Sequence, residues 1–175
     1  TTSDDILIKK LNNKYKKKIC IHKREEILSS INMDYKQAII DAINKFQKSN
    51  PDLIAILTLE NPLRKKHYIE QAISNLILHK SDLVIGTVPD FQNNYYKFSP
   101  NGIKLLSDQK NKRLRLEKNI IHKDVGAFSI MKFSSYLNNE IKKITNIVMD
   151  ANDSFVVNSK SDLLVLNRIA SRRYR

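Results

Sequence analysis

The residues best suited to chemistry are few in this sequence, and their spacing excludes several common sites. A single cysteine, Cys20, excludes an intrachain disulfide and a zinc site built on paired cysteines. It lies between Ile19 and Ile21, so we expect a buried structural thiol rather than a nucleophile. The histidines are scattered, and no two have the spacing of metal ligands or of an acid–base pair: His22, His67, His79 and His122.

The glycines form no phosphate-binding loop. Gly86, Gly102 and Gly126 are dispersed, and none lies in a strand–loop–helix segment whose backbone amides could bind a phosphate. A nucleotide site of that type is therefore not predicted within these 175 residues.

The net charge of +13 has two interpretations. It favours a polyanionic partner or a negatively charged small ligand. Alternatively, the many lysines, isoleucines and asparagines reflect the codon bias of an AT-rich genome. The aromatic and glycine signatures of common RNA-binding modules are absent, so a nucleic-acid partner is not expected.

No apolar run approaches the roughly 20 residues that span a bilayer. No charged-then-apolar signal segment lies at the start of the sequence. We therefore expect a soluble, cytoplasmic protein without a membrane partner.

The first half of the chain alternates between strand-like and helical patterns. Apolar residues at helical spacing predict amphipathic helices, and short uninterrupted apolar runs predict strands that are covered on both faces. The first predicted helix begins after the Ser3–Asp5 cluster, and two more cover residues 35–47 and 66–79. In the third helix the residues predicted to face inward are Ile69, Ala72, Ile73, Leu76 and Ile77. The predicted strands are residues 18–22, 53–57 and 82–88.

The second half is more varied. Alternation around Pro100-Asn101-Gly102 predicts a β-hairpin over residues 95–106, and the charged segment 109–118 is predicted to be a loop. Further strands are predicted at 125–131, 144–149 and 154–157, a helical turn at 133–137, and a final helix from Ser161-Asp162 to Ala170.

This order of elements predicts a three-layer α/β fold, with helices on both faces of a mostly parallel, Rossmann-like sheet. The apolar strands 53–57, 82–88 and 125–131 should lie side by side in it. No linker or repeat interrupts the chain, so residues 1–175 are expected to form one domain.

Four segments, in order, resemble the cytidylyltransferases that activate sialic acid and Kdo. Residues 2–5 with 23–27 are similar to the family's Ser-Thr-Asp-Asp and Arg-Pro-Glu-Glu-Leu, and residues 57–64 to Leu-Gln-Pro-Thr-Ser-Pro-Leu-Arg. Residues 115–130 resemble Arg-Gln followed by Asn-Gly-Ala-Ile-Tyr-Ile, and residues 154–163 resemble Ser-Ile-Asp-Ile-Asp-Thr-Glu-Glu-Asp-Leu. No single segment is decisive, and the specificity comes from their order along nearly the whole chain.

The resemblance implies a nucleotide-diphospho-sugar-transferase-like fold. It also implies an enzyme that uses Mg²⁺ to couple CTP to an acidic sugar, with release of pyrophosphate. It implies a homodimer in which the 95–106 hairpin reaches the partner. It also implies that the family's first strand and nucleotide-binding loop would stand before Thr1, so the domain is expected to lack them.

The resemblance also assigns candidate site residues. Arg115 and Lys123 match positions that bind the sugar carboxylate, although both could instead belong to a solvated basic loop. Thr58 stands where the family has a sugar-facing Gln, and Arg64 either meets substrate or pairs with an acid on its own helix. Ser3 and Asp4 fall on the nucleotide-binding motif.

The metal site departs from the family pattern. Val156 and Asn158 stand where the family has its two metal-binding aspartates, and valine cannot bind a metal. Asn158 is a neutral and weaker ligand, and Asp150 and Asp153 lie nearby as candidate replacements, although both are also typical turn residues.

Three functions remain open from the sequence. The first is an acidic-sugar cytidylyltransferase, and the second is a non-catalytic relative that keeps the fold to bind a ligand or partner. The third is a basic nucleic-acid-binding domain, for which only the charge speaks.

Overall fold

The computed structural model describes residues 4–15, 19–24, 35–46, 49–91, 95–100, 102–105 and 120–173. The chain divides into two compact units, Thr1–Asp52 and Leu53–Arg175. The predicted loop 109–118 lies outside the described residues.

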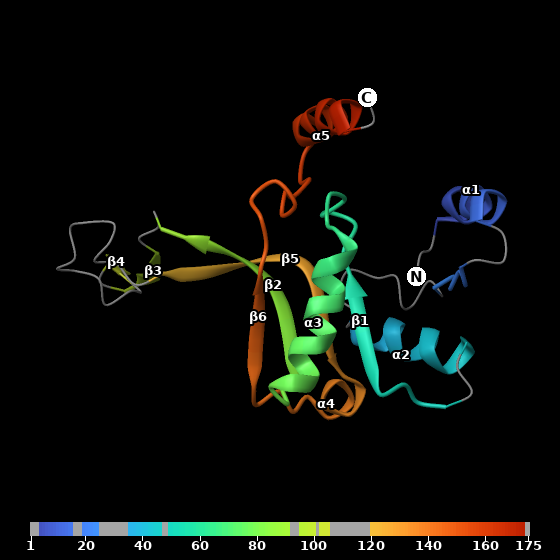
Figure 1. Ribbon diagram of the computed structural model, residues 1–175, viewed down its shortest axis with the longest axis horizontal. Helices are drawn as coiled ribbons and strands as arrows, with labels where there is room; N and C mark the ends of the chain where they lie inside the picture. Colours follow the sequence, from blue (N-terminus) through green and yellow to red (C-terminus); the bar gives the residue numbers. More distant parts are fainter. Residues whose placement is uncertain are drawn as a thin grey trace. The chain divides into compact units, whose positions relative to one another are not determined.

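Most of the described residues of the first unit lie in two helices, α1 (Asp5–Tyr15) and α2 (Tyr35–Phe46) (Figure 1). The Asp4 carboxylate accepts the backbone N–H groups of Ile6 (2.8 Å) and Leu7 (3.0 Å), which are donors that a helix start leaves unpaired. Both predicted helices are confirmed. Asp4 therefore serves as the N-cap of α1.

The segment before α2 is anchored by a histidine. His22 is buried, with Nε2 2.6 Å from the Asp41 carboxylate and its ring edge-on to Phe46, both on α2. The predicted strand 18–22 is wrong in its described part, since residues 19–24 contain only an isolated bridge at Lys23. The prediction that Cys20 is buried is also wrong, because its thiol is exposed. The segment is not a covered strand, and the side chain that it buries is His22.

A four-stranded sheet organises the second unit, in the order β1 (Leu53–Leu57), β5 (Ile121–Lys132), β2 (Leu83–Asp90) and β6 (Ile144–Val148). The three predicted core strands do lie side by side. The mostly parallel sheet is wrong, because β5 runs antiparallel to both β1 and β2 and only β2–β6 is parallel. An apolar run covered on both faces has the same pattern in either direction, so the sequence could not reveal the reversal.

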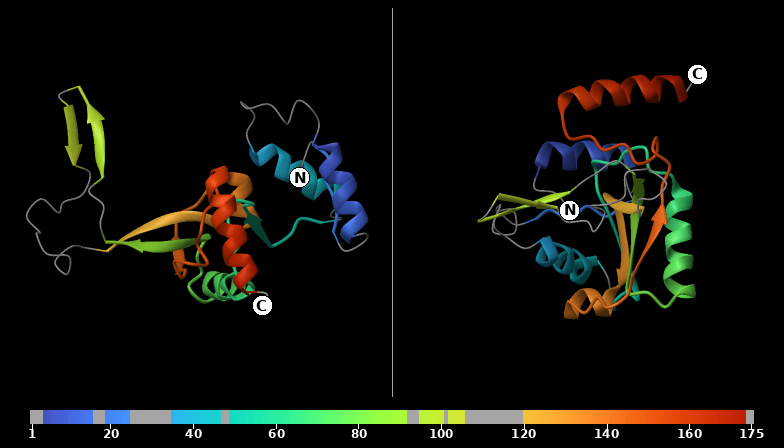
Figure 2. Two further views of the ribbon diagram at one scale, coloured as in Figure 1. Left: turned by 90° about the horizontal axis from the view of Figure 1, so that it is seen from above. Right: turned by 90° about the vertical axis from the view of Figure 1, so that its left-hand side faces the viewer.

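Helix α3 (Lys66–Leu78) covers one face of this sheet (Figure 2). Tyr68, Ala72 and Leu76 are its buried row and meet a core whose other members are Val84, Ala127, Phe128, Ile130 and Met149. Ile73 and Ile77, predicted inward, are exposed, because the buried row follows the i, i+4 positions of Tyr68. The short helix α4 (Phe133–Asn138) follows β5 and matches the predicted helical turn.

The packing under α3 requires a glycine in β2. A Cβ atom on Gly86 would lie 2.8 Å from the Met149 Sδ and 2.9 Å from the Phe128 Cε1, both closer than real Cβ contacts. Gly86 therefore serves close packing and not phosphate binding.

The predicted hairpin is confirmed as β3 (Tyr96–Ser99) and β4 (Gly102–Leu105), paired antiparallel. Cross-strand register places Tyr96, Phe98 and Ile103 on one face, and all three are exposed, Phe98 by 88%. Lys97 and Lys104 face each other on the opposite side. The hairpin thus has one apolar and one basic face.

The end of the chain is helical, as α5 (Lys160–Arg173) confirms. Its start is a reciprocal cap: the Asp162 carboxylate accepts the Ser159 N–H (2.8 Å), and the Ser159 hydroxyl accepts the Asp162 N–H (3.2 Å). The strand predicted at 154–157 is wrong, since these residues are irregular. None of the helices in the described ranges has the length and apolar content needed to cross a membrane.

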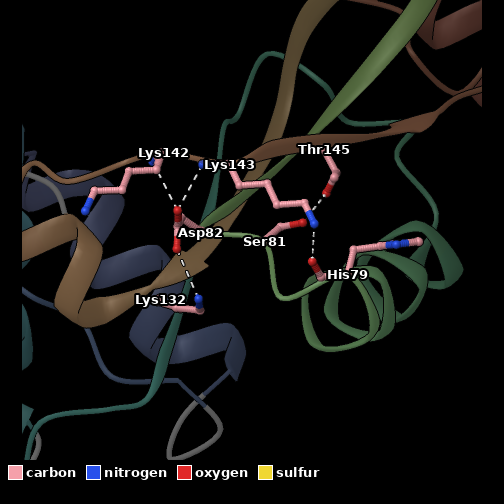
Figure 3. Close-up of polar contacts among 7 residues, drawn as sticks. All are labelled: His79, Ser81, Asp82, Lys132, Lys142, Lys143 and Thr145. Carbon is pink, nitrogen blue, oxygen red and sulfur yellow. Dashed lines mark hydrogen bonds and ion pairs between the residues drawn. The ribbon is translucent and has the colours of Figure 1, made fainter.

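The amino end of β2 is closed by one carboxylate (Figure 3). Asp82 accepts the backbone N–H groups of Lys142 (3.1 Å) and Lys143 (3.0 Å) and the ammonium of Lys132 (3.0 Å). The Lys143 N–H, then the Lys132 ammonium and the Lys142 N–H, lower the pKa of Asp82 to about 2. This carboxylate joins the start of β2 to the end of β5 and to the segment just before β6.

We therefore predict that Asp82→Asn lowers the melting temperature at neutral pH. A depressed pKa contributes stability above the unfolded value of 3.8, and this contribution is lost as the pH falls through about 2. Thermal unfolding across this range should show the gap between wild type and variant closing in acid. Asp52→Asn, at an exposed aspartate, is the control; a pH-independent gap would contradict the prediction.

Candidate functional site

The carboxyl ends of three strands meet at one edge of the sheet. These strands are β1, β2 and β6. They run in the same direction, because β1 and β2 are both antiparallel to β5 and β6 is parallel to β2. Open α/β sheets bind their ligands outside the carboxyl ends of such strands. This carboxyl edge, formed by residues 58–65, 121–127 and 149–158, is the candidate site.

The loop after β1 is bound to a bulge in β5. Opposite Gly86, the β2–β5 register passes from Ile85↔Ser129 to Thr87↔Asp124, and Gly126 takes a left-handed φ of 64°. The N–H of Gly126 donates to the Asp124 carboxylate (2.8 Å). The bulge breaks the regular ladder and leaves carbonyl groups for side chains to bind.

Two predicted site residues use those carbonyls. The Thr58 hydroxyl lies 2.7 Å from the Gly126 carbonyl oxygen and 3.0 Å from the Asn61 Oδ1, and its single proton serves one of them. The Arg64 guanidinium donates to the carbonyls of Ala127 and Thr58, the second at 3.3 Å. Partial burial lowers the pKa of Arg64. Arg64 thus braces the loop rather than pairing with an acid on its helix.

The segment after β6 is anchored to the start of α3 by a buried aspartate. Asp153 is 1% exposed, and its Oδ2 lies 2.8 Å from the Lys65 ammonium and 3.0 Å from the Tyr68 hydroxyl. The Tyr68 oxygen accepts the Asp150 N–H (3.1 Å), and burial is the first cause that raises the Tyr68 pKa. A further bond joins the Val157 N–H to the Glu60 carbonyl (2.8 Å).

These anchoring residues were missed by sequence reasoning. Asp153 was interpreted as a turn residue; it does lie in a turn, but its carboxylate is buried against Lys65. Asn61 is also buried, with its amide directed at the Ser154 carbonyl (3.5 Å). The only available signal was that polar residues follow two apolar strands, and no local spacing joins residues so far apart.

The candidate metal ligands do not form a suitable site. The side chains of Asp150 and Asn158 are exposed, and the nearby Asp162 carboxylate accepts the Asn158 and Ser159 N–H groups at the start of α5. Hydrogen bonding, first from the Ser159 side chain, lowers the pKa of Asp162. Within the described ranges no group of three or more His, Cys, Asp or Glu residues could hold a metal ion. The donor set implied for Mg²⁺ therefore does not fit.

The other predicted site residues lie in different parts of the chain. Lys123 is exposed on β5 opposite Val88, at the carboxyl edge. Asp4 belongs to the other unit as a helix cap, whereas Arg115 and Ser3 lie outside the described residues. The structure brings Thr58, Arg64, Lys123, Asp150 and Asn158 to one edge of the sheet.

A polar cluster on the sheet face opposite α3 lies at the same edge. The buried Thr87 hydroxyl accepts from the Asn146 amide (2.7 Å), and His122 Nδ1 lies 3.4 Å from both of these groups. The His122 side chain is exposed beyond them. Sequence spacing gave no signal for this cluster, because its members come from three strands.

Comparison with known proteins supports the fold. No protein-family model matches the chain, and a sequence search of curated proteins finds no relative. Among solved structures, 4-diphosphocytidyl-2C-methyl-D-erythritol synthase from Anaerococcus prevotii DSM 20548 is similar, with a TM-score of 0.66 and 10% identity. The match covers 96% of this chain and 77% of that chain. The fold is therefore α/β, of the nucleotide-diphospho-sugar-transferase type, with a mixed sheet.

We predict that Asp153→Ala lowers the free energy of unfolding by about 1–3 kcal/mol, because the buried Tyr68 hydroxyl loses its acceptor. Chemical denaturation measures this loss. Lys66→Met, which removes an exposed i, i+4 pair with Glu70, is the matched control and should change little. An Asp153→Ala variant as stable as the control would contradict the anchoring role.

Proposed function

We propose that this chain binds a cytidine nucleotide at the carboxyl edge, as a nucleotidyltransferase-like domain. The observation that carries the proposal is the convergence of the 58–65 loop, Lys123 and the 149–158 segment at the carboxyl edge, where open α/β sheets commonly bind their ligands. A protein with a similar fold is named for a diphosphocytidyl product, which favours cytidine among the nucleotides. Because a fold alone does not identify a ligand, a binding experiment with the four nucleotides tests this proposal.

The resemblance to the sialic acid and Kdo cytidylyltransferases supports an acidic sugar as second ligand. Lys123 is exposed at the edge and supplies a positive charge there, and Arg115 is the partner that the sequence assigns to the sugar carboxylate. Thr58 and Arg64 shape the site through the β5 carbonyls of Gly126 and Ala127, so their proposed role is positioning rather than direct contact.

The alternative is a non-catalytic relative that keeps the fold to bind a ligand or partner. Val156 and Asn158 at the family's metal positions favour it, as does the capping role of the Asp162 carboxylate. An acidic-sugar cytidylyltransferase and this relative share the nucleotide edge, and they differ in turnover. A nucleic-acid partner remains unexpected, and the charge of +13 alone supports it.

A homodimer is part of the same proposal. The apolar face of the hairpin, formed by Tyr96, Phe98 and Ile103, is exposed in this chain. An isolated two-stranded hairpin is at best marginally stable in water, so a cover for this face would stabilise it.

We predict that CTP raises the melting temperature more than ATP, GTP or UTP does. Loss of one charge-assisted contact should weaken binding roughly tenfold, so Lys123→Ala should reduce the shift. Lys104→Ala, at an exposed lysine of the hairpin, should not. Equal shifts for all four nucleotides would reject the proposed site.

With sialic acid or Kdo as ligand, Arg115→Ala should weaken binding by roughly tenfold, and Arg115→Lys should restore it only in part.

We predict that the chain does not release pyrophosphate from CTP at a useful rate with Mg²⁺ and sialic acid or Kdo. Loss of one electrostatic stabiliser commonly costs ~10²–10³ in rate, and Val156 and Asn158 remove two carboxylates. A coupled pyrophosphate assay tests this. A gain of activity in Val156→Asp/Asn158→Asp would identify a degenerate enzyme, whereas clear wild-type turnover would refute the prediction.

A further inference from the structure

Thr87 lies at the centre of a small patch on the sheet face opposite α3. Strands β5, β2 and β6 run side by side there (Figure 1), and Thr87 is paired with Asp124 of β5 and with Val148 of β6. Its diagonal neighbours on these two strands are His122 and Asn146. Paired residues on neighbouring strands share a face with the residues two positions away, so the four side chains surround Thr87 on one surface. These five residues form the Thr87 patch.

The hydrogen bonds inside the patch determine which nitrogen of His122 carries the proton. Thr87 is 2% exposed, and its hydroxyl accepts the Asn146 amide at 2.7 Å. The hydroxyl oxygen and the amide nitrogen each lie 3.4 Å from His122 Nδ1, at the long end of the hydrogen-bond range. The amide nitrogen can only donate, and the buried hydroxyl needs an acceptor for its own proton. Nδ1 is therefore the acceptor, and the neutral imidazole carries its proton on Nε2.

Three hydrogen-bonding groups of the patch are left for a ligand. Among the described residues none bonds His122 Nε2, Asn146 Oδ1 or the second carboxylate oxygen of Asp124. The side chains of His122 and Asp124 are exposed, and that of Asn146 is half-buried. The first Asp124 oxygen accepts the Gly126 N–H at the bulge. The patch thus offers one donor and two acceptors beside Val148, which is 52% exposed.

We infer that the Thr87 patch binds the hydroxyl groups of a sugar, with His122 donating through Nε2 and with Asp124 and Asn146 accepting. A hydroxyl both donates and accepts, so neighbouring hydroxyls match this set of groups. The C–H face of the sugar ring packs against Val148, since small-molecule sites combine apolar surface with a few placed polar groups. The inference rests on the proposed function, because a sugar is the second ligand proposed for the carboxyl edge.

Asp124 makes the patch selective for uncharged groups. Its carboxylate repels a phosphate or a carboxylate of the ligand, and the neutral imidazole of His122 supplies no charge to offset this repulsion. The same carboxylate forms a strong, charge-assisted hydrogen bond with a hydroxyl donor. The patch therefore binds the polyol part of an acidic sugar and not its carboxylate.

The first test examines the imidazole without a ligand. Long-range proton–nitrogen correlation NMR of the full chain distinguishes the two neutral tautomers of a histidine by the shifts of their ring nitrogens. His122 should carry its proton on Nε2. Thr87→Val removes one of the two donors at Nδ1, so the share of the other tautomer should rise severalfold. A wild-type ring with its proton on Nδ1 would overturn the inference.

The second test is a titration with sialic acid and with its methyl ester, which keeps the hydroxyls and removes the negative charge. Both probes should shift the amide signals of residues 122–124 and 146–148. His122→Phe should weaken the binding of either probe roughly fivefold. Asp124→Asn, which keeps an oxygen for the bulge, should weaken it roughly tenfold. His67→Phe, at an exposed histidine of α3, is the matched control and should change neither.

The outcomes separate the sugar patch from the nucleotide site. The inference is overturned if neither probe shifts the patch residues at millimolar concentration, or if the acid binds and the ester does not. An equal loss of binding in His67→Phe and His122→Phe would also overturn it. CTP is titrated into the same samples as a separate arm. An absence of CTP shifts together with sugar shifts at the patch would reject the nucleotide site and support the sugar patch.

Discussion

The carboxyl edge depends on the bulge in β5. Gly126 takes a left-handed backbone conformation there, and the carbonyls of Gly126 and Ala127 accept hydrogen bonds from Thr58 and Arg64. These bonds join the loop after β1 to a strand more than 60 residues later in the sequence. A side chain at position 126 would strain the backbone even though a Cβ has open space. Conformation, not crowding, requires glycine at this position.

The two edges of the sheet have different roles. At the amino edge, Asp82 is fully used by the Lys142 and Lys143 amides and the Lys132 ammonium, so this edge is a structural closure. At the carboxyl edge, Asp153 anchors the last segment to α3 through Lys65. Lys123 stays exposed beside that anchored framework. This rigid framework beside an exposed cation supports the proposal that the carboxyl edge binds an anionic ligand.

Sequence patterns predicted most elements and their neighbours. The apolar runs that became β1, β2 and β5 were found, and so were all five described helices and the hairpin. The direction of β5 could not be predicted, because a strand buried on both faces carries no directional signal. Cys20 was misplaced for a related reason: an apolar flank predicts burial only when a strand forms around it.

The candidate site was predicted less well than the fold. The resemblance selected Thr58 and Arg64 as substrate-binding residues; both lie at the carboxyl edge, where their side chains bind backbone carbonyls of β5. The Asp153–Lys65 pair and the Thr87–Asn146 contact join strands and loops distant in sequence. Such contacts follow from topology, and a single sequence gives no sign of them.

NMR can locate CTP on the protein and so tests directly whether the carboxyl edge is a nucleotide site. Backbone amide shifts of the full chain, followed during a titration with CTP, would report which edge of the sheet binds it. Binding at the carboxyl edge should concentrate the changes at residues 58–65, 121–127 and 149–158 and leave residues 79–82 and 142–145 unchanged. Shifts centred on the Asp82 edge, or no shifts at millimolar CTP, would contradict the proposal that the carboxyl edge is a nucleotide site.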